Sequence, residues 1–150
     1  MITADKIIVA LDEEQTYATD GLYLFGANAV VHINYLMGIL NSRLFVFVYR
    51  LLSLEKGRVL PQVKPTILGT LPIRTIDFAR TNDKSLHDQM IALVSKMLDL
   101  NKNLAKSKTP QEKSVIQRQV EAADRQIDKL VYKLYELTDE EIEIVEVASG

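Results

Sequence analysis

The sequence predicts an α+β protein, in which a small mixed α/β unit is followed by a long antiparallel helical hairpin and a short C-terminal helix. Short apolar runs of strand length in the first half, and two matched heptad rows in the second half, predict this order. The chain has 150 residues, of which 47% are hydrophobic and 25% charged, a composition typical of globular domains. We place the α/β unit at residues 1–80 and the hairpin with its terminal helix at residues 81–150.

The α/β unit is expected to begin with three strands. Residues 6–11 form an apolar run of strand length, and residues 16–19 and 22–25 predict two further strands. Asp20-Gly21 between the last two is typical of a hairpin turn.

One buried helix should follow, with Asn34 as its N-cap and apolar residues at helical spacing as far as residue 54. Residues 55–66 contain a glycine and two prolines and predict a loop, and one helical turn is expected after Pro65. Residues 71–76 favour an extended edge strand, because Pro72 lacks a backbone donor.

The second half carries the clearest pattern. Two helices are predicted from apolar residues spaced alternately by four and three positions: Leu86, Met90, Leu93, Met97, Leu100 and Leu104, then Ile116, Val120, Ala123, Ile127, Leu130, Leu134 and Leu137. Thr109 with Glu112 predicts a capping box for the second helix, and Thr138 with Glu141 predicts one for a short acidic last helix. A second apolar row, with Ile91, Val94 and Leu98 on the first helix and Val131 on the second, can cover the α/β unit or a partner, and plain packing within the chain is the favoured alternative.

No residue pattern indicates a self-contained active site. The chain has no cysteine, no Gly-rich phosphate loop and only two histidines, which are far apart in sequence. His87 lies beside the heptad row and is expected on the surface. We therefore expect no catalytic residues and no metal site. We also expect no membrane association, since no apolar stretch reaches a spanning length.

The charge is uneven along the chain. The net charge is −2, but residues 43–80 carry seven basic and two acidic residues, a local charge of +5. Such a segment can bind phosphates even in an acidic protein. Ordinary scatter of surface charge is the simpler alternative.

Three segments together resemble a known family. Residues 35–45 (YLMGILNSRLF) are similar to its "YLLaLLNSkLf" helix, residues 64–73 (KPTILGTLPI) to its "K…L..LPI" exit strand, and residues 130–142 (LVYKLYELTDEEI) to its "iD.lVY.LYgLteeEi" ending. The family is the TaqI-like C-terminal target-recognition, or specificity, domain of type II restriction–modification DNA adenine methyltransferases. The resemblance covers about residues 5–146.

The resemblance implies recognition of double-stranded DNA in the cytoplasm. The family's methyltransferase part, which binds S-adenosylmethionine, carries an Asn-Pro-Pro-Tyr/Phe motif, and the four prolines of this chain are never adjacent. We therefore expect a non-catalytic specificity module, with the cofactor bound by a missing upstream methyltransferase domain and no cofactor in this chain. The alternative is a protein-interaction module or a homodimer built on the hairpin helices.

Six residues are the candidates for DNA binding: Arg43, Arg50, Lys56, Arg58, Gln62 and Lys64. The loop residues Arg58, Gln62 and Lys64 carry side chains that can read base edges. Each has a plainer alternative, because Arg58 can close a turn, Gln62 can be solvated and Lys64 can pair with Glu55. Arg43 and Arg50 fit a structural or phosphate-facing role better than a base-reading one.

Overall fold

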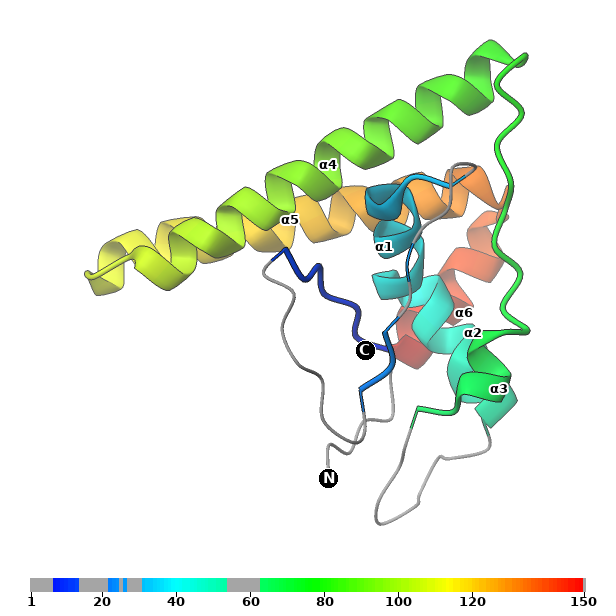
Figure 1. Ribbon diagram of the computed structural model, residues 1–150, viewed down its shortest axis with the longest axis horizontal. Coiled ribbons are helices and arrows are strands. Elements are labelled where there is room, and N and C mark those ends of the chain that lie inside the picture. Colours follow the sequence, from blue (N-terminus) through cyan, green and yellow to red (C-terminus); the bar gives the residue numbers. More distant parts are fainter. Residues whose placement is uncertain (1–6, 14–21, 25, 27–30, 54–62, 150) are drawn as a thin grey trace.

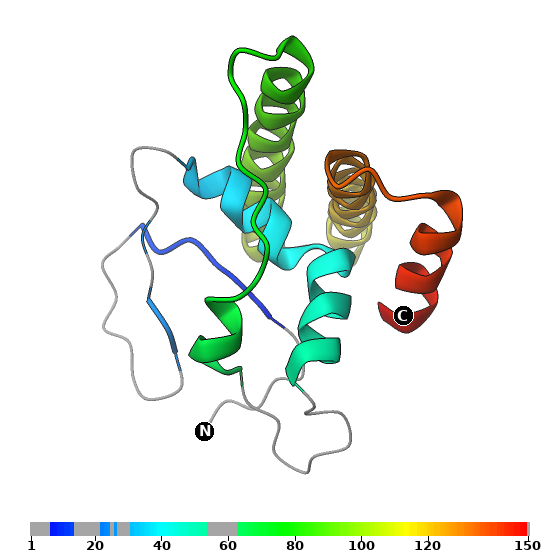
Figure 2. The same ribbon diagram turned by 90° about the vertical axis from the view of Figure 1, so that its right-hand side faces the viewer.

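The computed structural model describes residues 7–13, 22–24, 26, 31–53 and 63–149 (Figure 1). This part of the chain contains six helices: α1 (Ile33–Asn41), α2 (Arg43–Ser53), α3 (Pro65–Leu68), α4 (Thr81–Lys106), α5 (Pro110–Leu134) and α6 (Asp139–Ser149). Helices α4 and α5 form a long hairpin, and α1, α2, α3 and α6 gather near the end at which α4 begins and α5 ends (Figures 1 and 2).

The α+β expectation is wrong for the described residues, because none of them forms a strand. Residues 7–11 of the first predicted strand have no helical structure, but Val9 bonds to a side chain instead of a neighbouring strand. Its N–H donates to Asn41 Oδ1 (2.8 Å), and its carbonyl accepts from Asn41 Nδ2 (2.9 Å). The amide of Asn41 thus satisfies both backbone groups that a sheet would have satisfied.

The other predicted strands either form no strand or lie outside the described residues. Residues 22–24 are exposed and lie outside any strand, while residues 16–19 and the turn at residues 20–21 lie outside the described segments. Residues 71–76 form no strand either, and their backbone is bonded by tyrosine side chains. Tyr135 Oη accepts from Arg74 N (3.0 Å) and donates to the Pro72 carbonyl (2.8 Å).

The predicted helix of residues 34–54 is divided into α1 and α2 at Ser42, which has an extended backbone (φ −68°, ψ 155°). Its hydroxyl donates to the Ile39 carbonyl at 2.7 Å, and the carboxylate of Asp128 accepts from Arg43 N at 2.9 Å. Both ends of the break are therefore bonded to side chains. In the described segments no single helix is long and apolar enough to cross a membrane, and α1 and α2 reach that length only together, with a 64° bend between them.

The start of α1 also differs from the expectation. His32 is the N-cap residue of α1, and its Nδ1 accepts a hydrogen bond from Asn34 N at 3.2 Å. Asn34, the expected cap, instead donates from Nδ2 to Ser95 Oγ at 3.0 Å. Its side chain therefore joins α1 to α4.

The hairpin and its caps are confirmed. Thr109 Oγ1 accepts from Glu112 N (3.2 Å) while the Glu112 carboxylate accepts from Thr109 N (3.3 Å), so both halves of the capping box are present. Thr138 and Glu141 form the same pair of bonds before α6. The helical turn α3 and the short last helix are also where the sequence predicts them.

The hairpin opens toward its base, and α1 packs there against α4 and α5 (Figure 2). Gly38 permits the close approach: a Cβ on it would lie 2.5 Å from Met90 Sδ and 3.0 Å from Val94 Cγ2. The second apolar row of α4 thus covers α1, as expected for Val94. The outer heptad residues Leu100 and Leu104 are only half-buried, since two helices alone cannot enclose them.

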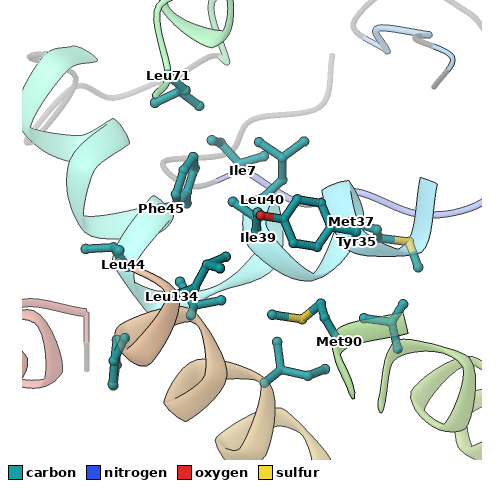
Figure 3. Packing of buried hydrophobic residues seen from close by; sticks show 14 of the residues in the cluster. Ile7, Tyr35, Met37, Ile39, Leu40, Leu44, Phe45, Leu71, Met90 and Leu134 are labelled. Carbon is teal, nitrogen blue, oxygen red and sulfur yellow. The ribbon is translucent and has the colours of Figure 1, made fainter. Parts of the chain in front are cut away.

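One hydrophobic core joins both predicted units. Residues from α1 and α2, such as Tyr35, Ile39 and Phe45, pack with Met90 of α4 and Leu134 of α5 (Figure 3). The division into domains at residues 1–80 and 81–150 stays a prediction.

His87 is buried, so its expected surface position is wrong. Its ring lies 5.3 Å from the ring of Tyr35 and 5.1 Å from that of Phe78, measured between centroids. These two rings pack against His87, which lies on α4 beside the heptad row.

The Gly38 contact yields a paired test. Gly38→Val should lower the free energy of unfolding by roughly 1–3 kcal/mol, because the new side chain meets Met90 in a packed interior. Met90→Ala alone should also destabilise the chain, because it shortens a buried side chain. The double variant should lose less than the sum of the two single losses, because the shorter side chain at position 90 makes room for the valine. Urea denaturation measures the two single variants and the double variant, and Gly69→Ala, whose Cβ would lie 3.6 Å from its nearest neighbour, is the control. A double variant that is less stable by the sum of the single losses would contradict the contact.

Candidate nucleic-acid interface

The candidate loop is only partly described. Lys56, Arg58 and Gln62 lie outside the described residues, so their DNA contacts stay predictions. Lys64 is described: it is the N-cap residue of α3, and its backbone N–H donates to Tyr49 Oη at 2.9 Å. Tyr49 is fully buried in α2. The chain therefore leaves the loop at a point that is fixed to the core.

Arg43 is held between two acidic side chains. Its Nε lies 3.3 Å from Asp128 Oδ2, and its Nη1 lies 2.6 Å from Glu146 Oε2. These contacts link α2 to α5 and α6. Of the two roles expected for Arg43, they favour the structural one.

Arg50 lies in the last turn of α2, and its Nη1 donates to the Ala148 carbonyl at 3.2 Å. Ala148 belongs to the last turn of α6, where backbone carbonyls lack helical partners. Both arginines of α2 thus contact α6. This helix carries most of the acidic residues at the end of the chain.

Asp128 is the buried centre of this contact. Burial raises the pKa of its carboxyl to about 6, and the nearby charges of Asp124 and Glu146 act in the same direction. The N–H and the guanidinium of Arg43 act in the opposite direction by favouring the carboxylate. Glu146 is itself bonded by the Tyr132 hydroxyl at 2.8 Å.

A second polar cluster holds the connection between α3 and α4 against the hairpin; we call it the Arg74 clamp, formed by Arg74, Asp83, Tyr35 and Tyr135. Arg74 Nη2 lies 3.4 Å from Asp83 Oδ1, and Arg74 Nη1 donates to the Leu134 carbonyl. Tyr35 Oη donates to the Arg74 carbonyl at 2.8 Å. Burial raises the pKa of Tyr135, so its hydroxyl stays protonated and able to donate.

The sequence gives little warning of the clamp. Tyr35 and Tyr135 lie inside the motifs that carry the resemblance, but nothing in their spacing shows that they meet the same segment. In the sequence, Arg74 is one of the seven basic residues of the segment 43–80, and no pattern sets it apart from the other six.

The match to known families covers the segment that ends at this clamp. Residues 2–73 match the model of the TaqI-like C-terminal specificity domain. This segment is similar to that family over slightly less than half of the chain. The resemblance is thereby confirmed for this segment, and its extension through the hairpin to residue 146 stays a prediction. Comparisons with curated proteins and with solved structures give no match.

The specificity domain and the hairpin are in direct contact. The matched segment stops at Ile73, one residue before Arg74, and includes both α1 and α2. Helix α1 packs on α4, and the Arg74 clamp bonds the end of the segment to α5. No group of three or more His, Cys, Asp or Glu side chains suited to a metal ion occurs in the described ranges.

Asp128 gives a prediction on pH. Its carboxyl has a higher pKa in the folded chain than in the unfolded one, so its ionisation weakens folding as the pH rises from about 4 to about 6. In Asp128→Asn this loss is absent, while Asn can still accept from Arg43 N. The melting temperature of the variant, relative to the unsubstituted chain, should therefore rise between pH 4 and pH 7. A relative melting temperature that falls over this range would show that the ion pair with Arg43 outweighs burial.

The clamp gives a prediction on stability. Tyr135→Phe should destabilise the chain by about 1–3 kcal/mol, because Arg74 N loses its acceptor and the Pro72 carbonyl loses its donor. Chemical denaturation measures the loss. Tyr23→Phe, at a residue whose side chain is 50% exposed, should change little and is the matched control. Equal effects of the two substitutions would argue against the clamp.

Proposed function

We propose that this chain selects a DNA sequence for a restriction–modification enzyme and is not catalytic by itself. The match of residues 2–73 to the specificity domain carries the proposal, since such a domain is the recognition module of these enzymes. The basic character of residues 43–80 supports it independently.

The proposed contact centres on the segment between α2 and α3. The chain enters it after Ser53, which is buried, and leaves it at Lys64, which is bonded to Tyr49. Binding residues are commonly carried on a loop whose ends are held by a rigid scaffold. Lys56, Arg58, Gln62 and Lys64 supply cations for phosphates and forked or amide groups for base edges.

In this proposal, cofactor binding and methyl transfer are carried out by a partner domain. A methyltransferase domain would bind S-adenosylmethionine and transfer its methyl group to adenine, while this chain would set the position on the DNA. We place the assembly in the cytoplasm, with its DNA substrate.

A groove on the hairpin favours a second candidate function, protein interaction or homodimerisation. It is lined by apolar and polar side chains: Gln89, Ala92, Leu93, Gln126, Lys129, Leu130 and Lys133. Sedimentation of the chain with and without duplex DNA separates the two functions. A monomer that binds DNA supports recognition, whereas a dimer that ignores DNA supports the alternative.

The loop assignment has a direct test. Arg58→Ala with Lys64→Ala should weaken binding to duplex DNA and reduce the slope of log K against log salt by about 2, since each lost phosphate contact contributes about 0.9. Fluorescence anisotropy at several salt concentrations measures both quantities. Lys84→Ala with Lys96→Ala removes the same charge from exposed positions on α4 and is the control. Equal slopes for the two pairs would contradict the loop assignment.

A further inference from the structure

The charges of the hairpin are separated along its length. We call residues 102–118 the hairpin tip; it carries five basic residues and one acidic residue, for a net charge of +4. The rest of the hairpin, residues 81–101 and 119–134, carries five basic and six acidic residues, for a net charge of −1. The excess of positive charge is therefore confined to the outer end.

Most of this positive charge is not neutralised within the part of the chain that the structure describes. The acidic residue of the tip, Glu112, has its carboxylate bonded to the N–H groups of Lys108 and Thr109, both at 3.3 Å. Lys102 Nζ is paired with Glu13 at 2.8 Å. Four exposed cations form no ion pair with any described residue: Lys106, Lys108, Lys113 and Arg118.

These four cations lie outside the hydrophobic core. Along α4 the last buried residue is Val94, and along α5 the first is Ala123, so the tip extends beyond the core (Figure 1). Four like charges on one projecting end repel each other and weaken the hairpin.

The surface between the two helices adds groups suited to phosphate. A groove at the tip is lined by Asn101, Leu104, Ala105, Lys113, Ser114 and Gln117. Amide, hydroxyl and ammonium donors are the side-chain groups that commonly bond phosphate oxygens. The groove therefore offers both charge and donors on the same surface.

We propose that the hairpin tip is a second DNA contact, which binds the phosphate backbone beside the recognised sequence without reading bases. The inference rests on the proposed function, because it assumes that the specificity domain is on DNA. The part of α4 beyond the core, from Ser95 to Lys106, has 12 residues. As a helix it spans about 18 Å, which is roughly the length of five base pairs of duplex. The tip would thus add affinity and salt dependence to a domain whose chain is acidic overall.

The test compares two variants of the full chain that lose the same charge. The tip variant carries Lys106→Gln, Lys108→Gln, Lys113→Gln and Arg118→Gln. The base variant carries Lys84→Gln, Lys96→Gln, Lys129→Gln and Lys133→Gln, all at exposed positions of α4 and α5. Circular dichroism checks that both keep their helices. Anisotropy then measures binding to a duplex of about 40 base pairs over a series of salt concentrations.

The tip variant should lose roughly 3 to 4 from the slope of log K against log salt, and the base variant should lose clearly less. Equal losses would overturn the tip contact and leave the proposed function standing. If the unsubstituted chain binds no duplex, the proposed function fails and the tip contact fails with it. If the tip variant keeps its DNA affinity but no longer binds polyglutamate, the tip belongs to an acidic protein partner and the inference is overturned.

Discussion

The fold depends on the bonds that fix one extended connection to the hairpin. Between α3 and α4 the chain has no helix or strand of its own, so side chains from elsewhere must satisfy its backbone. Tyr135 bonds both Pro72 and Arg74, and Tyr35 bonds the Arg74 carbonyl. Through these contacts the end of the specificity domain is tied to α5. The orientation of the domain on the hairpin follows from this attachment together with the packing of α1 on α4.

Local patterns in the sequence were sufficient for the hairpin and insufficient for the first half. The heptad rows and the caps at Thr109 and Thr138 act over a few residues, so they can be recognised without knowing the fold. The expected strands fail for the opposite reason. Apolar runs at residues 6–11 and 71–76 predict strands. In the structure, however, the side chains of Asn41 and Tyr135 bond the backbone groups that neighbouring strands would have bonded in a sheet. Likewise, α1 ends at Asn41, and Asp128, which lies 85 positions after Arg43, accepts a hydrogen bond from the Arg43 N–H at the start of α2.

The candidate site shows a similar division. The resemblance to the specificity domain could be recognised from short motifs, and the match over residues 2–73 confirms it for that segment. The separate roles of the basic residues could not be predicted from the sequence, because a count of charges does not show what each side chain contacts. Arg43 and Arg50 contact α6, and Arg74 contacts Asp83, so these three side chains join parts of the fold as well as adding to the surface charge. The local charge of +5 therefore overstates the cations of this segment that are left for phosphates.

The central claim is that the specificity domain is built onto the hairpin as one cooperative body. Amide hydrogen exchange at increasing urea concentration tests it most directly, because it reports the opening free energy of each element separately. The account predicts that buried amides of α1 and α2, such as those of Ile39 and Phe45, share the opening free energy and urea dependence of Val94 and Val131 in the hairpin. Hairpin amides that stay protected while those of α1 and α2 exchange through a smaller opening would contradict it.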